Sequence, residues 1–296
     1  MRAAMNHNQD HLAARAAPAL FVLLWSTGFI GTKYVINNAD PLTYLAIRMA
    51  VVVCLMAIIA GVARPKWPDR VGIAHSAVAG ILVHGFYLGG TAIAISHSIP
   101  AGLSALIPGL QPILTSTIAN RWLGEKVTPV QWGGLLLGLG GVALILHNRP
   151  MTGEAGLGWL ASVVSLISIT LGTLYQRRYC NHIDWRAGNL VQYVAVTLFF
   201  TAGAFLFEDR VVHWTREFVL ALGWLAVALS IGSISLLYWL IRHAAATSVA
   251  SLFYLVPAVT ALMAYLLFGE KLDALAIAGM AMCAAAVFVV NRRFGS

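Results

Sequence analysis

Long apolar runs are the feature that most constrains how this chain folds. Ten of them, each close to the length of a membrane span, alternate with short segments rich in charge, proline or glycine. A transmembrane helix needs about 20 apolar residues to cross the hydrocarbon layer, where the backbone must satisfy its own hydrogen bonds. The runs therefore predict an all-α membrane protein with ten transmembrane helices, at residues 18–36, 41–62, 71–96, 100–122, 129–147, 157–178, 188–207, 217–240, 246–268 and 272–291.

The composition supports the same fold class. Of the 296 residues, 59% are hydrophobic and 10% are charged, and the mean hydropathy is +0.80. An ordinary soluble domain carries about 25% charged residues. The predicted spans and their short loops use the whole length, so we expect no separate soluble catalytic domain. Such high hydrophobicity also excludes a disordered chain.

The net charge of +8 indicates membrane topology rather than nucleic-acid binding, because most basic residues lie in the loops. An even number of spans places both termini on one side of the membrane. That side carries 13 of the 19 lysines and arginines, the other side carries five, and Arg48 lies within a span. The positive-inside rule therefore predicts that both termini are cytoplasmic. The expected tails are residues 1–17, which lack the apolar core of a signal peptide, and residues 292–296.

The sequence shows no cluster of reactive groups. The three cysteines are far apart and the nine histidines have no paired spacing, so we expect neither a metal nor a cofactor. No nucleophile with a neighbouring base is evident, so we do not expect an enzyme. All 11 acidic residues fall in loops or at the edges of spans. Because proton pumps commonly use an intramembrane carboxylate, we also expect no carboxylate-based proton coupling.

An internal repeat divides the chain. When the sequence is shifted by 145 residues, Gly124-Glu125-Lys126 falls on Gly269-Glu270-Lys271 and Pro112 falls on Pro257. Over residues 100–146, 11 of 47 positions are identical without a gap. Each half, 18–147 and 157–291, holds five spans, and an odd number forces the second half to enter the membrane the opposite way. Such inverted repeats are typical of secondary transporters, whose substrate site lies near the midplane where the repeats meet.

The repeat, Trp25 and Gly28 in the first span, and Pro41 and Arg48 in the second resemble the drug/metabolite transporter superfamily, in particular its ten-helix EamA-type branch. The resemblance covers nearly the whole chain. It implies alternating access around a midplane cavity in the inner (plasma) membrane of a bacterium, with spans five and ten peripheral. Within the superfamily the chain looks most like bacterial exporters of amino acids, including aromatic ones. One departure is Pro108-Gly109, where the second half has Phe253-Tyr254, so the two halves differ in shape.

Arg48 is the clearest candidate for a functional residue. It lies one to two turns from the outer end of the second span, where an arginine costs about 2.5–3.5 kcal/mol on insertion scales. Its planar guanidinium suits the recognition of a carboxylate. The alternative is structural, with Arg48 capping backbone carbonyls or pairing with Asp40 or a polar neighbour.

Two prolines, Pro112 and Pro257, lie near the centres of the fourth and ninth spans. A proline inside a helix removes one hydrogen bond and kinks the helix. The matching positions favour a hinge or a broken segment at the site, and the alternative is a fixed kink for packing. Gln111, next to Pro112, is a polar group at the predicted midplane and a candidate ligand.

Further polar-tipped side chains lie inside the predicted spans. His84 and Tyr87 are three residues apart and share a helix face. The complete predicted substrate-binding set is Trp25, Arg48, His84, Tyr87, Gln111, Tyr175, Gln192, Tyr238, Trp239 and Tyr254. Each of the aromatic and amide groups has packing as its alternative role. Together they suggest an aromatic, mildly polar cavity.

The sequence thus predicts a secondary transporter that exports neutral amino acids or similar small metabolites. Carriers of phosphates or nucleotide sugars need several intramembrane cations, whereas here only Arg48 lies inside and Lys33 near the outer edge. The alternatives are a carrier of another metabolite or drug and, less favoured, a channel-like facilitator or a membrane enzyme. The expected partners are the solute and the lipid bilayer. Gly134 and Gly138 have small-xxx-small spacing, which fits packing within a monomer or a weak homodimer.

Overall fold

The computed structural model describes residues 2–97, 99, 104, 108–124, 126–146, 155–268 and 273–291, and these ranges are almost entirely helical. Within them the sole β-type pairing is an isolated bridge between Ala39 and Val212. The all-α class is therefore confirmed. Glu125, the Gly269-Glu270-Lys271 tripeptide and the tail 292–296 lie outside the described residues.

The helices follow the predicted spans closely. Eight are long and apolar enough to cross a membrane, at Ala16–Ile36, Pro41–Ala63, Arg70–Ser96, Gly156–Tyr179, Trp185–Phe207, Arg216–His243, Ala246–Leu267 and Ala274–Asn291. The ninth, α7 (Pro129–Leu146), is apolar and slightly shorter. The tenth, predicted at 100–122, is described in part, as η2 (Pro108–Leu110) and α6 (Gln111–Trp122).

Several spans consist of more than one helical segment. The first and second spans are single helices, α1 (Arg2–Ile36) and α2 (Pro41–Ala63). The third span comprises α3 (Arg70–Gly80), η1 (Ile81–Phe86) and α4 (Tyr87–Ser96). The second half comprises α8 (Ala155–Tyr179), α9 (Trp185–Phe207), α10 (Arg216–Trp224), η3 (Leu225–Ser233), α11 (Ile234–His243), α12 (Ala246–Ser251), η4 (Leu252–Tyr254), α13 (Leu255–Phe268) and α14 (Ala274–Asn291).

Polar residues at the span ends define where the helices begin. Asp69, Asp184 and Thr215 accept hydrogen bonds from backbone N–H groups in the first turns of α3, α9 and α10. The N-terminus of α2 is capped from another span, because the Glu208 carboxylate accepts the Leu42 and Thr43 N–H groups, each at 2.7 Å. These contacts satisfy N–H groups that have no partner within their own helix. The acidic capping residues, Asp69, Asp184 and Glu208, therefore lie at the ends of the bundle.

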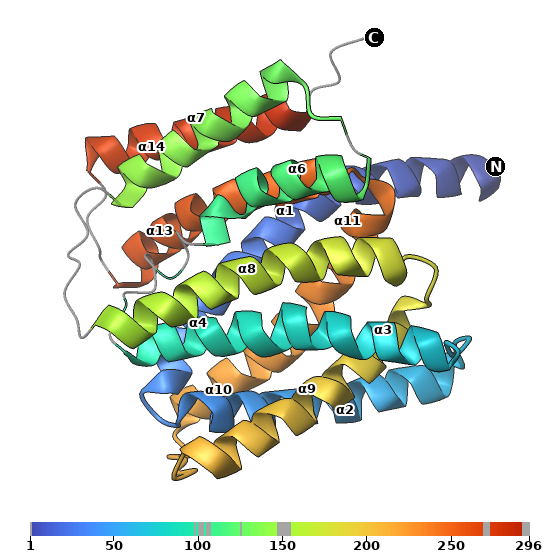
Figure 1. The fold of residues 1–296 in the computed structure, drawn as a ribbon, viewed down its shortest axis with the longest axis vertical. Coiled ribbons are helices and arrows are strands. Elements are labelled where there is room, and N and C mark those ends of the chain that lie inside the picture. The colour runs from blue at the N-terminus through green and yellow to red at the C-terminus, as the bar shows by residue number, and fades with distance from the viewer. Residues whose placement is uncertain are drawn as a thin grey trace.

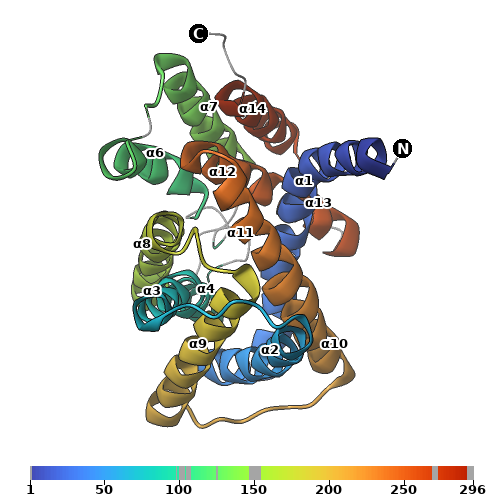
Figure 2. The same ribbon diagram turned by 90° about the vertical axis from the view of Figure 1, so that its right-hand side faces the viewer.

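Helix packing follows the two-fold relation that inverted repeats require. The second span of each half pairs with its counterpart, α2 with α9, and the fifth does the same, α7 with α14. The first span of each half packs on the third of the other: α1 lies against α10–η3–α11, and α8 lies against α3–η1–α4. Figures 1 and 2 show α7 and α14 as a pair at one edge of the bundle. Helix α1 begins and helix α14 ends at the same end of the bundle, hereafter the terminal end (Figure 1).

Irregular turns occur at matching places in the two halves. The third span contains the π-helix η1, and the eighth contains the π-helix η3. The fourth and ninth spans contain short 3₁₀ turns, η2 and η4, and a new α-helix follows each. Pro112 and Pro257 are the second and third residues of these new helices, α6 and α13. They therefore lie in a first turn, where a missing N–H costs little, directly after a break in the span. A broken segment is one of the arrangements that the sequence favours, and a hinge at this break stays a prediction.

The glycines of α7 allow a close approach to neighbouring helices of the same chain. A Cβ atom on Gly138 would lie 2.5 Å from the Tyr254 ring, and one on Gly141 would lie 2.7 Å from the Gly279 carbonyl oxygen of α14. Gly134 similarly faces Val289 and Val290. This face of α7 therefore packs inside the described chain.

Two alanine substitutions in α7 test this packing. Gly141→Ala should lower the free energy of unfolding by roughly 1–3 kcal/mol, because a backbone carbonyl cannot move without separating α7 from α14. Gly133→Ala, where a Cβ atom meets nothing within 4 Å, should raise it by up to about 1 kcal/mol through helix propensity. Thermal melting in detergent measures both. Equal effects of the two changes would contradict the proposed contact.

Candidate functional site

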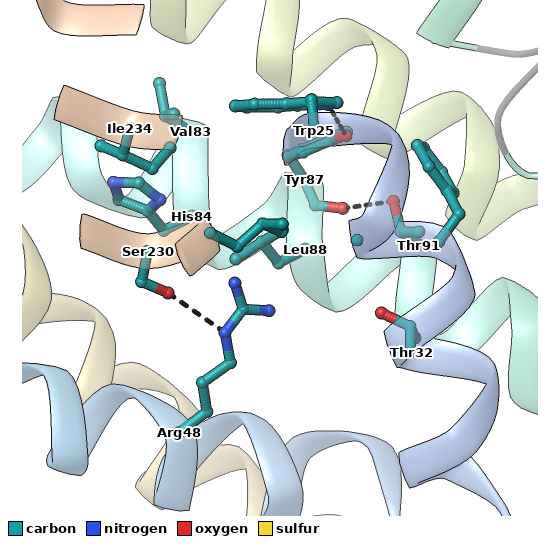
Figure 3. A pocket seen from close by; sticks show the side chains of 13 residues that line it. Trp25, Thr32, Arg48, Val83, His84, Tyr87, Leu88, Thr91, Ser230 and Ile234 are labelled. Carbon is teal, nitrogen blue, oxygen red and sulfur yellow. Dashed lines mark hydrogen bonds between the residues drawn. The ribbon is translucent and has the colours of Figure 1, made fainter. Parts of the chain in front are cut away.

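A central cavity lies where the two repeats cross. It is lined by 13 residues from α1, α2, η1 and α4 of the first half and from η3 and α11 of the second (Figure 3). Four of the predicted binding residues meet there, namely Trp25, Arg48, His84 and Tyr87, and each is at most 4% exposed. The other lining residues are Gly28, Phe29, Thr32, Val83, Leu88, Thr91, Leu229, Ser230 and Ile234.

Arg48 supplies the fixed charge of this cavity. Its side chain rises from α2, and its Nε atom donates a hydrogen bond to the Ser230 hydroxyl at 3.1 Å (Figure 3). Tyr44, Tyr87 and Tyr193 surround the guanidinium. No carboxylate in the described part of the chain pairs with it. The pairing with Asp40 does not occur, because that carboxylate accepts the Arg210 N–H instead. A polar neighbour, Ser230, takes the place of an ionic partner.

The two π-helices bring polar groups to the cavity. In η3 the wider turn lets the Ser230 hydroxyl donate to the Leu225 carbonyl, five residues earlier, at 3.2 Å. The Tyr193 hydroxyl donates to the Ser230 carbonyl and holds this turn from α9. In η1 the π-helix carries His84, whose ring lies 4.9 Å from that of Tyr193. The His84 Nε2 atom is buried and makes no hydrogen bond of normal geometry. Single-turn π-helices frequently mark functional sites.

An aromatic wall closes one side of the cavity. The Trp25 Nε1 atom donates to the Tyr87 hydroxyl at 3.1 Å, and the two rings stack with centroids 5.8 Å apart. Phe21 and Phe253 pack behind Trp25 at centroid distances of 5.1 and 5.2 Å. These contacts explain why Trp25 lies deep in its span, because its Nε1 atom has a hydrogen-bond partner and its ring forms part of the wall.

The cavity is nearly closed in this conformation. Its free space is about 30 Å³, which is room for about two water molecules by the usual size of one water site. An amino acid does not fit without movement of the surrounding helices. In this structure the cavity is therefore too small to hold such a solute.

The remaining predicted residues lie elsewhere. Gln111 lines a separate small cavity between α6, α8 and α12, where its Nε2 atom donates to the Thr173 hydroxyl at 3.4 Å. The Tyr175 hydroxyl hydrogen bonds with His75 at 2.7 Å near the terminal end. Trp239 is 37% exposed and stacks on His243. The structure does not bring these residues to the central cavity.

Tyr254, Gln192 and Tyr238 occupy three other places in the fold. The Tyr254 hydroxyl donates to a backbone carbonyl of α7 at 2.6 Å and stabilises the contact between η4 and α7. Gln192 and Tyr238 are buried just beyond His84 on the terminal side. They are neighbours of the cavity and do not line it.

Sequence reasoning missed three polar groups that complete the site, because Ser230, Thr32 and Thr91 line the cavity. Tyr193, a polar-tipped residue of the seventh span that the sequence does indicate, lies directly behind it. Serine and threonine are common in membrane helices, so their presence in an apolar run gives no signal by itself. Only the π-helical register brings the Ser230 hydroxyl to Arg48.

Comparisons with known proteins agree with this architecture. The sequence profile of the EamA-like transporter family matches residues 16–147 and again 156–292. The "Uncharacterized inner membrane transporter YedA" of Escherichia coli (strain K12) is 23% identical, with 92% of this chain and 89% of that protein aligned. The "Probable amino-acid metabolite efflux pump" of the same organism is 24% identical, with coverages of 91% and 92%. The "Probable terminal-alkyne amino-acid exporter" of Streptantibioticus cattleyicolor is 29% identical, with coverages of 94% and 93%.

The fold also matches a solved crystal structure. It superposes with a TM-score of 0.76 over 94% of this chain and 96% of the other, at 20% sequence identity. At that identity the match concerns the arrangement of the helices, and it confirms the architecture of two five-helix repeats.

Replacing Arg48 with methionine tests whether this residue is structural. Because the buried charge has no carboxylate partner in the described chain, Arg48→Met should raise the free energy of unfolding by roughly 1–3 kcal/mol. Thermal melting of the solute-free protein measures the change. Arg210→Met is the control and should lower stability, because Arg210 donates to the carbonyls of Ala204, Phe205 and Glu208 at the end of α9. Destabilisation by Arg48→Met would instead assign Arg48 to the scaffold.

Proposed function

The chain belongs to the EamA-like transporter family, and we propose that it is a secondary transporter that exports neutral amino acids, including aromatic ones, by alternating access. The observation that carries the proposal is Arg48, a buried cation in the central cavity without a carboxylate partner in the described chain. A solute carboxylate that binds there supplies the missing charge. Its planar geometry matches the guanidinium, whose Nε atom is already held by Ser230.

The charge of the cavity limits the solute. Its 13 lining residues include one fixed cation, Arg48, and no carboxylate. One guanidinium balances one carboxylate, whereas a phosphate ester or nucleotide sugar brings two or more charges and requires further cations. The charge balance therefore favours a monocarboxylate or a zwitterion. The names of two relatives, an amino-acid metabolite efflux pump and an amino-acid exporter, support the same class.

The aromatic wall favours an apolar or aromatic side chain on that solute. Trp25, Phe29 and Tyr87 offer ring surface, and Leu229 lies in the facing repeat. Rings of this kind contribute through burial and stacking. Neutral amino acids, including aromatic ones, combine the required carboxylate with such a side chain.

Direction, coupling and orientation are part of this proposal. Both the family resemblance and the relatives' names support export. Because no carboxylate lines the cavity, we propose a carrier that works without carboxylate-based proton coupling, by exchange or facilitated diffusion. We place it in the inner membrane with the terminal end in the cytoplasm, since that side carries 13 of the 19 basic residues.

The occluded cavity favours a carrier over a channel. A channel-like facilitator needs a continuous open path, whereas the free space here is about 30 Å³. A carrier of another metabolite or drug uses the same fold and remains the second candidate. Saturable counterflow separates a carrier from a channel, because only a carrier exchanges bound solute across the membrane without net flow.

Counterflow in proteoliposomes with labelled neutral amino acids tests the proposal. We expect saturable exchange, and Arg48→Ala should weaken it about 10–100-fold, the equivalent of one lost hydrogen-bonded charge contact. Arg48→Lys keeps the charge but loses the planar fork, so an intermediate effect is expected. Methyl esters of the same amino acids, which lack the anionic carboxylate, should not exchange.

The matched control is Arg210→Lys, a change of the same type just beyond the end of α9 and outside the central cavity, which should leave exchange unchanged. Exchange of a sugar phosphate with no exchange of any amino acid would overturn the substrate class. Full exchange in Arg48→Ala would remove Arg48 from the site.

A further inference from the structure

Buried polar groups without partners continue from the central cavity to the terminal end. Beyond His84, the side chains of Ser76, Asn189, Gln192, Tyr238 and Arg242 come from three adjacent elements, α3, α9 and α11. We refer to these five residues as the terminal column. Ser76, Asn189 and Gln192 are each 0% exposed and Tyr238 is 1% exposed.

The column is continuous with the cavity. The Gln192 amide faces both His84 and Tyr238 without completing a hydrogen bond of normal geometry to either. The Arg242 guanidinium lies over the Tyr238 ring, 5.2 Å from its centroid. Asn189 is one turn from Gln192 on the same face of α9. The series therefore leads from the cavity wall to the end of α11.

These groups are left unsatisfied in a way that a permanent structure avoids. The Ser76 and Tyr238 hydroxyls, both amide atoms of Asn189 and Gln192, and the Nε atom of Arg242 are buried and complete no hydrogen bond of normal geometry, although Cys180 faces Ser76 and Gln192 faces Tyr238. Native proteins satisfy nearly all such groups, and within a membrane the loss is larger because lipid offers no partner. The free-energy cost of burying these polar atoms is offset if they form hydrogen bonds with water or solute in another conformation.

Close packing closes the column and an arginine covers it. A Cβ atom on Gly80 would lie 2.8 Å from the Gln192 Cα atom, so α3 and α9 touch backbone to backbone at this level. At the mouth, Arg242 donates to the Ile183 carbonyl and joins α11 to the loop between α8 and α9. Asp184 lies beside Tyr238 at the same mouth. The terminal end of the column is therefore lined by polar groups, and the elements around it pack closely in this structure.

We propose that the terminal column is the terminal-end half of the transport path, closed by helix packing in this structure and filled by water and the transported solute when the Arg242–Ile183 contact opens. The inference rests on the proposed transport function and goes beyond the central site. It gives Gln192 and Tyr238 a role as transient solute contacts between the mouth and Arg48. It also assigns Arg242 to the gate on that side.

A native cysteine reports on the opening. Cys180 is 0% exposed and lies beside Ser76, Tyr238 and Arg242. Burial raises the pKa of its thiol to about 11, so it reacts slowly while the column is closed. Cys283 is the matched control, because it is also 0% exposed but lies between α7 and α14, away from the column.

The test measures modification of Cys180 by a membrane-impermeant methanethiosulfonate reagent, with the full chain in nanodiscs and Cys54→Ser removing the exposed thiol. Arg242→Gln should raise the modification rate of Cys180 at least tenfold, because it weakens the contact that covers the column. The rate at Cys283 should not change. Peptide mass spectrometry assigns each modification. An unchanged Cys180 rate in folded Arg242→Gln protein would overturn the proposal.

A second pair of variants keeps the test independent of folding defects. Gln192→Leu and Tyr238→Phe remove unsatisfied polar atoms and retain the bulk of the side chains. Both should raise the melting temperature by about 2–4 °C, slow Cys180 modification and slow transport. A lower melting temperature with unchanged Cys180 modification would show that these groups only stabilise the fold, and would contradict the proposal.

The labelling experiment needs no known solute, so its outcome is separate from that of counterflow. Amino-acid exchange with an inert Cys180 in Arg242→Gln would overturn the column and leave the proposed function intact. The expected labelling without any amino-acid exchange would support the column and overturn the proposed substrate.

Discussion

The buried charge of Arg48 is the constraint on which the rest of the site depends. An arginine in the hydrocarbon layer must face a polar space or a partner. Here it faces a cavity of about 30 Å³, a serine hydroxyl and a group of tyrosines. The surrounding helices therefore maintain a polar centre that is open to interaction with one anionic group. In the alternating-access mechanism that we propose, a solute that compensates this charge lowers the free-energy cost of closing the cavity around it.

Both repeats supply residues to the central cavity, and both contain irregular turns near it. Each half contributes a π-helix, η1 and η3, and these carry His84 and Ser230 to the same cavity. Each half also contains a 3₁₀ turn followed by a proline in the next helix. Irregular turns are weak points in a hydrogen-bonded helix, so they are suitable places for bending. The polar terminal column breaks the symmetry of the two halves, and we infer that it marks one side of the path.

Sequence reasoning predicted most of the fold and four of the 13 residues that line the central cavity, for reasons that individual residues illustrate. Span positions followed from apolar runs, and Arg48 and His84 stood out because charged and titratable groups are rare within such runs. Tyr238 and Trp239 show the limit. These neighbours point in different directions, one buried and one 37% exposed, but both carry a ring with a polar atom, which suits a cavity and a membrane interface alike. The shift of register in η3 that brings Ser230 to Arg48 left no trace in the sequence, whereas Pro112 and Pro257 did indicate the breaks in the fourth and ninth spans.

The central claim is that a solute carboxylate compensates Arg48 within the membrane. Solid-state NMR can measure the dipolar coupling between a ¹³C-carboxyl-labelled neutral amino acid and ¹⁵N-guanidinium-labelled protein in lipid. The account predicts a coupling that corresponds to a carbon–nitrogen distance of about 4 Å, as expected for a carboxylate hydrogen bonded to a guanidinium, and its loss in Arg48→Lys. Bound amino acid with no such coupling, or a coupling that persists in Arg48→Lys, would contradict it.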